Sequence, residues 1–484
     1  MYVKRLTIEN IKGFSGSHVF EFSEGLNYLV GDNNCGKSTV YDALLYLLSG
    51  KDPGEDFRAI GAEQPIRVEV MLAGEDLRAL VDDEKFAKYS EYLHEVDGQD
   101  SFRVERLDVT RSVIQGSGKS VALTGKVACF WHPVRAQFEN PSGIDALFKA
   151  LLDLQPIWAD ENPGDLADFS TTKTLGRLVN ESANQFFQTQ RWIDFLEAHG
   201  TAFAGDEDDS LVGHARGIAV DLQELVEEQY GEAAVRLDFV VPEPVAFVKM
   251  GRVLVDDGAG ETTIGSKGTG MQRAFALAVI QLYARSRQKA GATSKRHVLL
   301  LDEPETWLHP KAQLRLGAAL AEIARAQQVF LTTHSPYLLK AFEPQAHQLT
   351  VFKGRGKSRT VHTARSMGAG GSGSPSWGEI TYVAFGIASR EFHDELFGRA
   401  YAACHVDLAL AQDKIAREDQ VDAWLEGKGL AKSSGWARPG QQAKACTLPT
   451  RVRNFIHHPE NMSNGQLSDD ELAASVQELV PLVP

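Results

Sequence analysis

A short glycine-containing loop between a strand pattern and a helix pattern constrains this chain more than any other feature. Residues 31–38 read G-D-N-N-C-G-K-S, which fits the pattern G-x-x-x-x-G-K-[ST]. Residues 26–30 before the loop are apolar like a buried strand, and residues 38–48 after it have helical apolar spacing. The backbone N–H groups of such a loop and the N-terminus of its helix bind phosphate oxygens. The sequence therefore predicts a phosphate-binding strand, loop and helix within an α/β fold.

The side chains around this loop match the chemistry of ATP binding. Lys37 can neutralise the β and γ phosphates, and the hydroxyl of Ser38 can hold Mg²⁺. The residues expected to bind the nucleotide here are Lys12, Gly31, Asn33, Asn34, Gly36, Lys37, Ser38 and Thr39. A second string, G-S-G-K-S at residues 116–120, has Val113 where the pattern requires its first glycine, so it predicts a hairpin turn instead.

Two later strand patterns end in residues suited to ATP hydrolysis. Residues 297–305 read H-V-L-L-L-D-E-P-E, a buried strand that ends in two adjacent carboxylates. We expect Asp302 to hold the Mg²⁺ shell and Glu303 to polarise the attacking water. The strand pattern at residues 329–333 is followed by His334, which is predicted to contact the γ phosphate.

The length of 484 residues exceeds what a single hydrophobic core usually holds, so we expect two or three structural units. The patterns divide the chain into an ATPase lobe at 1–141, a helical insertion at 142–235, a second ATPase lobe at 236–365, a linker at 366–378 and a mainly helical C-terminal domain at 379–484. The linker is rich in glycine, serine and proline. The predicted fold class is therefore α/β with a mixed sheet and a helical insertion, plus an α-helical C-terminal domain.

Composition and charge indicate where the protein is located and which kinds of partner it can bind. No apolar stretch approaches the roughly 20 residues that a membrane span requires, and the N-terminus lacks the pattern of a secretory signal, so we expect a cytoplasmic protein with no membrane contact. The four scattered cysteines predict free thiols. The formal charge of −15 argues against a protein coated in basic surface for nucleic acid. A local exception is residues 427–459, which contain six Lys or Arg and no Asp or Glu.

The order of these motifs resembles the ABC-type ATPases of the SMC, RecF and OLD group over about residues 1–355. Residues 8–14 (I-E-N-I-K-G-F) are similar to the first strand and turn of that group, and residues 303–310 (E-P-E-T-W-L-H-P) are similar to its D-loop region. Residues 265–273 (G-S-K-G-T-G-M-Q-R) stand where the signature motif is expected, in a form typical of OLD-like proteins that departs from L-S-G-G-Q.

This resemblance implies an ABC-type head that binds ATP and Mg²⁺ between two subunits. The signature of one subunit closes over nucleotide held by the other, so the resemblance implies at least a head-to-tail homodimer. The implied nucleotide-binding residues are Ser266, Gly268, Gly270 and Gln272, with Gln137 as the candidate lid glutamine. The insertion is too short for the long coiled coil of SMC proteins. Neither the glutamate nor the Asp-x-Asp of a TOPRIM nuclease, which OLD proteins usually carry, is found after residue 340.

The C-terminal domain carries a short string that resembles the R-x(4 to 6)-H motif of HEPN ribonucleases. Residues 450–458 read T-R-V-R-N-F-I-H-H between two prolines, with Thr450 expected to cap a short helix. Arg453 would stabilise charge on a phosphate, and a histidine would move a proton at the 2′-OH or the leaving oxygen. Family spacing selects His458, whereas helix geometry favours His457, so both remain candidates. The basic helix could instead be a structural cap or a docking surface.

These features predict an ATP-hydrolysing ABC-type ATPase of antiphage defence, whose nucleotide state controls a C-terminal HEPN-like, metal-independent RNase. RNA would bind at the basic C-terminal segment. One alternative is a sensor or scaffold ATPase that controls a separately encoded toxin or nuclease. Another is a RecF-like DNA-repair ATPase, which predicts salt-sensitive duplex binding.

Overall fold

The computed structural model describes residues 1–49, 57–59, 65–108, 111–114, 120–123, 126–158, 167–170, 173–204, 208–239, 243–258, 260–289, 296–306, 308–354, 360–364, 375–410 and 416–483. The chain forms two compact units. The first contains Met1–Ala159 and Ala290–Pro484, and the second contains Asp160–Lys289. Each unit is described by itself below.

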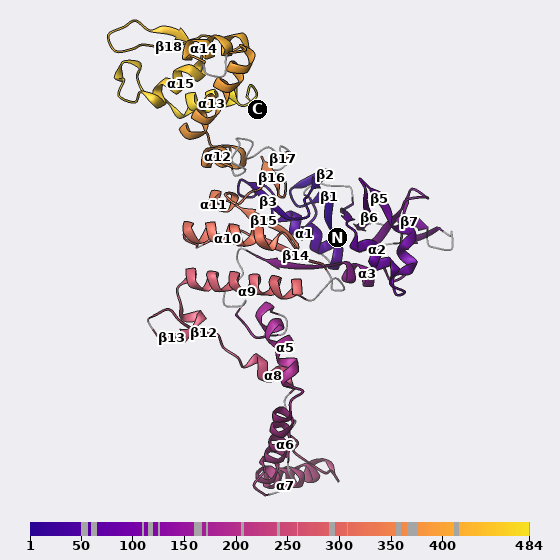
Figure 1. Ribbon diagram of the computed structural model, residues 1–484. Coiled ribbons are helices and arrows are strands. Elements are labelled where there is room, and N and C mark those ends of the chain that lie inside the picture. The colour runs from indigo at the N-terminus through magenta and orange to yellow at the C-terminus, as the bar shows by residue number, and fades with distance from the viewer. Residues whose placement is uncertain are drawn as a thin grey trace. The chain divides into compact units, whose positions relative to one another are not determined.

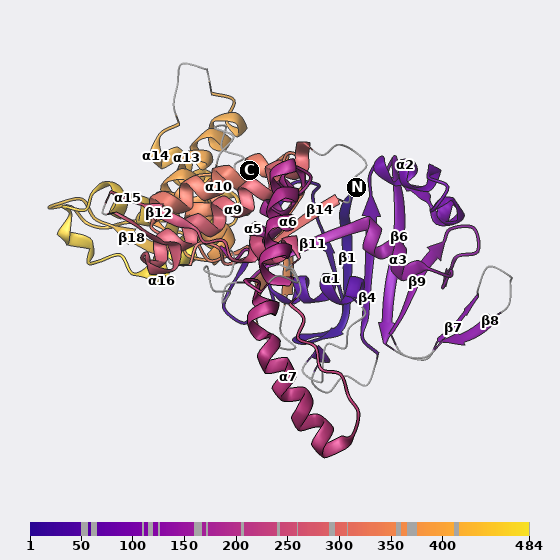
Figure 2. The ribbon, with the colours of Figure 1, turned by 90° about the horizontal axis from the view of Figure 1, so that it is seen from below.

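The first unit contains a largely antiparallel sheet with the strand order β2-β1-β4-β6-β9-β10-β7-β8, and β5 pairs with β6 at one end. Figure 2 shows β1, β4, β6 and β9 side by side. Its strands are β1 (Tyr2–Ile11), β2 (Phe14–Glu21), β4 (Arg67–Ala73), β5 (His94–Val96), β6 (Gln99–Asp108), β7 (Arg111–Ile114), β8 (Ser120–Leu123), β9 (Lys126–His132) and β10 (Gln137–Glu139). The antiparallel pairing of β7 with β8 confirms the expected hairpin, whose turn at 115–119 lies outside the described residues.

A second sheet in the same unit has the order β11-β14-β15-β3-β16-β17, and Figure 1 follows β14, β15, β3 and β16 across it. Every pair is parallel except β16 with β17. Its strands are β3 (Leu26–Gly31), β11 (Leu152–Ile157), β14 (Arg296–Asp302), β15 (Gln328–Thr333), β16 (Gln348–Lys353) and β17 (Thr360–Ala364). The helices of this region are α1 (Thr39–Ser49), α2 (Asp76–Asp82), the 3₁₀ helix η2 (Ala87–Tyr92), α3 (Ile144–Leu151), α10 (Pro310–Ile323) and α11 (Pro336–Leu339).

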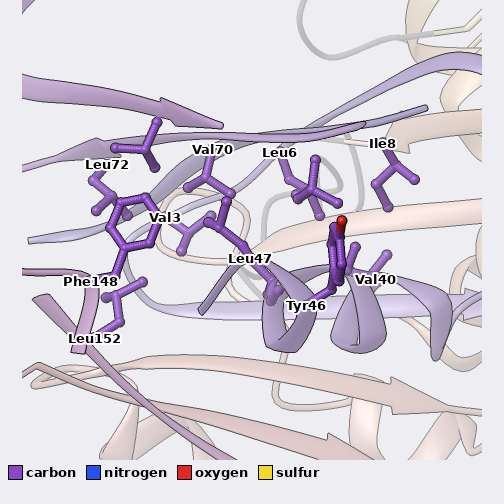
Figure 3. Packing of buried hydrophobic residues seen from close by; sticks show 14 of the residues in the cluster. Val3, Leu6, Ile8, Val40, Tyr46, Leu47, Val70, Leu72, Phe148 and Leu152 are labelled. Atoms are coloured by element: carbon purple, nitrogen blue, oxygen red, sulfur yellow. The ribbon is translucent and has the colours of Figure 1, made fainter. Parts of the chain in front are cut away.

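Helix α1 packs its apolar face against the first sheet and thereby fixes the loop that precedes it. Figure 3 shows Val40, Tyr46 and Leu47 of α1 next to core residues from β1 and β4. Leu47 is 1% exposed. Truncating such a buried leucine to alanine costs about 2–5 kcal/mol of stability. The start of α1 is consequently held in place by the largest hydrophobic cluster of the described core.

The helical insertion begins later than the sequence predicted. The expected helix near residue 144 is α3, but it belongs to the first unit and is followed directly by β11, which pairs in parallel with β14. Leu152 and Leu154 alternate with polar residues over a strand of only six residues, and that is too short to outweigh the helical pattern around it. Residues 235–239, expected to return to the sheet, form neither helix nor strand.

The second unit is mainly helical. It contains α5 (Thr174–Phe186), α6 (Gln190–Ala204), α7 (Leu211–Tyr230), α8 (Pro244–Lys249), the hairpin β12 (Leu254–Asp256) and β13 (Glu261–Thr263), η3 (Ile264–Ser266) and α9 (Thr269–Lys289). Ser210 starts α7 because its hydroxyl accepts a hydrogen bond from the Gly213 N–H at 2.9 Å. The signature segment lies between β13 and α9, within this unit rather than in the sheet of the first.

The C-terminal region is mainly helical and has its own hydrophobic cluster, which includes Phe392, Leu425, Val452 and Val476. Its elements are α12 (Trp377–Phe385), α13 (Arg390–Asp407), α14 (Glu418–Gly427), β18 (Ser434–Trp436), β19 (Lys444–Cys446), α15 (Leu448–His457), η5 (Met462–Asn464) and α16 (Asp469–Leu479). The helical character is confirmed, but the β18–β19 hairpin was not anticipated. None of the helices in the described residues is both long and apolar enough to cross a membrane.

Two helix starts in this region test the sequence reasoning about caps. The predicted capping box of the last helix is present, because Ser468 Oγ accepts from Glu471 N at 3.1 Å and the Glu471 carboxylate accepts from Ser468 N at 3.1 Å. The expected cap at Thr450 is wrong. Helix α15 starts at Leu448 after Thr447, because Pro449 is favoured in the first turn of a helix. Thr450 lies inside the helix and is buried.

Candidate functional site

The predicted ATP-binding residues of the first unit converge at one edge of the second sheet. Strands β14, β15 and β3 are neighbours and run in parallel, with Asp302 opposite Thr332 and Thr333 opposite Val30. The carboxyl ends of parallel strands meet at the same edge of a sheet, which is where ligands bind in open α/β folds. This edge carries the glycine loop after β3, the two carboxylates after β14 and His334 after β15.

The backbone of the glycine loop adopts the conformations that a phosphate-binding loop requires. Gly31 has φ +142°, and a Cβ at this position would lie 2.2 Å from the carbonyl oxygen of Phe352 in β16. Asn34 and Gly36 also have positive φ values, 62° and 99°. Asn33 and Asn34 are exposed on the loop. The loop therefore turns tightly against the sheet and leads directly into Thr39 at the start of α1.

Lys37 lies at the centre of this edge. Its side chain is buried, and Nζ donates hydrogen bonds to the carbonyl oxygens of Gly31 at 3.2 Å and Asp32 at 3.0 Å. Nζ also lies 2.8 Å from Nε2 of His334, and the same Nε2 lies 3.1 Å from Oε1 of Glu303. Burial, followed by the charge of Lys37, lowers the pKa of His334. Nε2 of a neutral His334 therefore lies between the lysine and the second carboxylate, where it accepts from Lys37 in one tautomer and donates to Glu303 in the other.

Ser38 and Asp302 provide oxygen ligands of the type that Mg²⁺ binds. The hydroxyl of Ser38 donates to Oδ1 of Asp302 at 2.8 Å, and the hydroxyl of Thr332 donates to the same oxygen at 2.6 Å. Hard cations prefer hydroxyl and carboxylate oxygens, and Mg²⁺ usually keeps several waters. The two predicted metal ligands therefore lie side by side, and the residues fit a nucleotide-bound Mg²⁺.

Glu303 follows the strand in an unusual backbone conformation. Its φ is +43°, in the left-handed region that costs a residue with a Cβ roughly 1–2 kcal/mol. The Glu303 N–H compensates by donating to both the carbonyl oxygen of Thr332 at 3.2 Å and its hydroxyl at 3.0 Å. Strained residues of this kind are concentrated at functional sites. The strain turns the chain sharply after Asp302, so that Glu303 approaches His334.

Three residues that sequence reasoning did not assign hold this edge together. Tyr41 of α1 donates to the carbonyl oxygen of Leu301 and accepts from Thr332 N, both at 2.9 Å. Burial raises its pKa well above the usual value. Thr332 bridges Asp302 and Glu303, as described above. The available signal was a pair of threonines at the end of an apolar strand that leads into His334.

Glu305 is the third of these residues. Its Oε1 accepts from the hydroxyl of Thr333 at 2.6 Å and from the backbone N–H of His334 at 2.8 Å. Burial raises the pKa of this carboxyl group. The second glutamate of the E-P-E string therefore ties the loop after β14 to the loop after β15. Trp307 in the same string lies outside the described residues.

Two other predicted nucleotide contacts lie away from this cluster. Lys12, in the turn after β1, places Nζ 2.5 Å from Oδ2 of Asp42 in the first turn of α1. Gln137 begins β10 in the first sheet and donates to Oε1 of Glu139 at 3.1 Å. That hydrogen bond places its amide in the network of Arg135 and Glu139. The structure does not bring Gln137 into the hydrogen-bonded group around Lys37 in the described residues.

The signature segment forms an exposed loop in the second unit. The side-chain amide of Gln272 donates to the carbonyl oxygens of Gly265 at 3.0 Å and Lys267 at 2.7 Å. The hydroxyl of Ser266 lies 3.0 Å from that of Thr263. Gly268 has open space where a Cβ would be, and Gly270 follows in the first turn of α9. Gln272 thus holds a small-residue loop open in front of a helix N-terminus.

The C-terminal candidates separate into two groups. Nη1 of Arg453 donates to Oε2 of Glu418 at 2.9 Å, and Glu418 lines a pocket of about 280 Å³ together with His458. His457 is not among the residues that line this pocket, and its Nε2 lies 2.6 Å from Oδ1 of Asp394 in α13. His393, close by in sequence to Asp394, is fully buried and hydrogen-bonded to Ser475. Of the two histidines, only His458 lines this pocket, together with Glu418, the partner of Arg453.

A phosphate-binding loop, a carboxylate pair and a histidine at the edge of a parallel sheet, joined to an antiparallel sheet around α1, define an ABC-type P-loop ATPase head. Comparison with known proteins agrees with this class. The profile of a family described as "AAA domain, putative AbiEii toxin, Type IV TA system" matches residues 26–340, and the chain belongs to this family. It is an ABC-type ATPase of the SMC, RecF and OLD group, as the sequence predicted.

Individual relatives are distant. The Old nuclease of Escherichia phage P2 is 24% identical over 326 residues, covering 65% of this chain and 53% of that protein. The DNA replication and repair protein RecF of Pasteurella multocida is 28% identical over 149 residues, covering 30% of this chain and 35% of RecF. The chain thus spans about half, or less, of the length of these relatives. An Smc head bound to the C-winged helix domain of ScpA aligns with a TM-score of 0.43 and 15% identity over 75% of this chain and 98% of that one.

Proposed function

We propose that this protein binds ATP with Mg²⁺ at the carboxyl edge of β3, β14 and β15 and hydrolyses it. The observation that carries this proposal is the close approach of Lys37, His334 and Glu303, next to the hydrogen-bonded Ser38–Asp302 pair. Binding, metal and hydrolytic groups from three separate segments meet there. Bound Mg²⁺ would neutralise charge on the phosphates.

The chain's own residues then have distinct tasks. Lys37 would leave the carbonyl oxygens of the loop and pair with the β and γ phosphates, which releases His334 to contact the γ phosphate. Glu303 would accept a proton from the water whose oxygen attacks the γ phosphorus, as the bond to ADP breaks. Asn33, Asn34, Gly36 and Thr39 would bind phosphate through the loop and the start of α1. Lys12 beside Asp42 would lie near the same helix start.

We further propose that two copies associate head to tail. Ser266, Gly268, Gly270 and Gln272 form a loop whose glycines leave its backbone accessible, and Gln272 keeps it in one shape. Such a surface suits a phosphate presented by another subunit. Gln137 remains a proposed lid residue. A cytoplasmic setting and a role in antiphage defence complete the proposal, supported by the family's connection with toxin systems and by the Old nuclease relative.

The proposed output is metal-independent RNA cleavage by the C-terminal domain, controlled by the nucleotide state. His458 would move a proton while the 2′-oxygen attacks phosphorus, the bond to the 5′-oxygen breaks and that oxygen takes up a proton. Arg453 would stabilise the charge that develops on the phosphate. His457, held by Asp394, is the less favoured candidate because Glu418 connects Arg453 with the pocket at His458.

The test is to incubate the purified protein with total cellular RNA, with and without ATP and Mg²⁺, and with EDTA added after activation. Wild-type protein is expected to cleave RNA and to continue in EDTA, whereas Arg453→Ala/His458→Ala is expected to be inactive with unchanged ATP turnover. ATP turnover without any cleavage would refute the RNase and point to a scaffold that controls a separate effector. Stimulation of turnover by duplex DNA, weakening steeply with salt, would point to a RecF-like activity.

A further inference from the structure

The β18–β19 hairpin of the C-terminal domain carries the cations of the basic segment that are not paired with acids among the described residues. Residues 427–459 contain six Lys or Arg. Four of them are paired with acids, because Lys428 lies near Asp407, Lys432 near Glu426, Arg451 near Glu471 and Arg453 near Glu418. The remaining two, Arg438 and Lys444, are exposed and have no ion-pair or hydrogen-bond partner for their side chains among the described residues. Both lie in or next to the hairpin.

An aromatic residue of the same hairpin is a neighbour of both cations in pairing or in sequence. Trp436 pairs directly across the hairpin with Lys444, and directly opposed residues project from the same face of a two-stranded sheet. Arg438 follows two residues after Trp436. The indole also packs edge-on against Phe455 of α15, with ring centroids 5.0 Å apart. A cation, an indole and a second cation therefore occupy one short stretch of surface that α15 supports.

The backbone after Trp436 is held rigidly in place. The Ala437 N–H donates to Oδ1 of Asn464 at 2.7 Å, and the Ala437 carbonyl accepts from the amides of Asn461 and Asn464, both at 2.8 Å. Both backbone groups of one hairpin residue are thus satisfied by two side chains of the loop after α15. This clamp forms a fixed wall for the pocket that Trp436, Arg438 and His458 line together.

Two carboxylates also line the pocket. Glu418 is satisfied by Arg453 and by the amide of Asn454. Glu460 lies 3.4 Å from Nδ1 of His458 and is mostly exposed. Among the described residues that line the pocket, the cation without an acidic partner is the guanidinium of Arg438. The pocket has a volume of about 280 Å³, which is of the order that one nucleotide requires.

We propose that the β18–β19 hairpin and this pocket bind single-stranded RNA, with a base stacked on Trp436 and the backbone phosphates held by Arg438 and Lys444. Proteins that bind unpaired nucleic acid combine an aromatic platform with cations that follow the backbone. The pocket would place the neighbouring phosphate beside His458. The choice of RNA rests on the proposed cleavage activity. The docking site itself rests on the hairpin, which contains none of the proposed catalytic residues.

The experiment measures binding separately from cleavage. The full-length protein is titrated into a fluorescent 2′-O-methyl oligoribonucleotide of twelve uridines, which lacks the attacking 2′-hydroxyl, and anisotropy is recorded at several salt concentrations. Arg438→Gln/Lys444→Gln is expected to bind at least tenfold more weakly. Its slope of log affinity against log salt is expected to be smaller by about 1.4, because each phosphate contact to a single strand contributes about 0.7. Trp436→Phe should retain most of the affinity and Trp436→Leu should lose it.

Arg390→Gln is the matched control, because Arg390 is an exposed arginine at the start of α13 in the same domain. It removes the charge of one cation outside the hairpin and should leave affinity and salt slope unchanged. Equal affinity and slope for wild type and the hairpin variant would overturn the inference, as would tighter binding of the matching DNA oligonucleotide. Hairpin-dependent binding without cleavage of unmodified RNA would refute only the RNase, and cleavage with hairpin-independent binding would refute only this site.

Discussion

The ATPase edge and the C-terminal basic helix differ in how their functional residues come together. At the edge, Lys37, Asp302, Glu303 and His334 come from three segments, which follow β3, β14 and β15, and residues nearly 300 positions apart lie 2.8 Å from each other. At the helix, Arg453 and His458 are close in sequence, and Glu418, which pairs with Arg453, lines the same pocket as His458. Convergence from distant segments is hard to produce without a function. A short string on one helix has structural explanations as well, so it needs stronger tests.

The largest effect is expected at the convergent edge. Lys37→Ala and Glu303→Gln should each reduce ATP turnover by two to three orders of magnitude, because one removes phosphate stabilisation and the other the group that orients and deprotonates water. Turnover is measured by phosphate release. Glu322→Gln, an exposed glutamate paired with Arg325 on the surface, is the matched control and should be fully active. Undiminished hydrolysis in either of the first two variants would contradict the assignment of this edge.

The next effect separates the two histidines of the C-terminal helix. His458→Ala should reduce RNA cleavage at least a hundredfold, since it removes the proton-transferring group at the pocket. His457→Ala should retain most cleavage because His457 contacts Asp394 and not the pocket. Cleavage products are resolved by length after activation with ATP. The reverse order of effects would assign the activity to His457 and remove the support for the pocket as the reaction site.

A smaller effect is expected from a residue that only positions others. Thr332→Val conserves shape but removes the hydroxyl that donates to Asp302 and accepts from Glu303 N. The loss of such hydrogen bonds costs about 1–2 kcal/mol, so turnover should fall about fivefold to thirtyfold. Thr332→Ser should restore most of it, and the KM for ATP should change less than kcat. A Thr332→Ser variant as slow as Thr332→Val would show that the methyl group, and not the hydroxyl, matters.

The sequence predicted the edge better than its surroundings, for physical reasons. The sequence patterns around four residues of the edge are distinctive and lie within a few neighbouring positions. These patterns identified Lys37, Ser38, Asp302 and His334. Thr332 and Glu305 were not assigned, because their roles depend on which strands are neighbours. The residues next to a parallel strand in the sequence do not indicate which strand pairs with it. For the same reason β11 was read as part of a helical insertion. Thr450 was wrongly predicted to cap the helix. Proline is favoured in the first turn, so the helix already includes Pro449 and starts after Thr447.

The smallest expected effect concerns the stability of the C-terminal domain. His393 is fully buried between α13 and α16, where its Nε2 lies 2.8 Å from the Ser475 hydroxyl, and burial lowers its pKa to about 4. The unfolded chain, with a histidine pKa near 6.5, binds a proton before the folded domain does. Stability is therefore complete above about pH 6.5 and falls as the pH decreases towards 4. At pH 5.5 the expected loss is about 1.4 kcal/mol, or tenfold in the opening equilibrium.

Hydrogen exchange of the amides in α13 and α16 measures this loss locally, which matters because a chain with several units does not unfold in a single step. His393→Leu should abolish the extra opening between pH 7 and 5.5, whereas His405→Leu, at the end of α13, should leave it unchanged. Equal pH dependence in both variants would assign the acid sensitivity to another group of the domain, and the buried histidine would then contribute only packing.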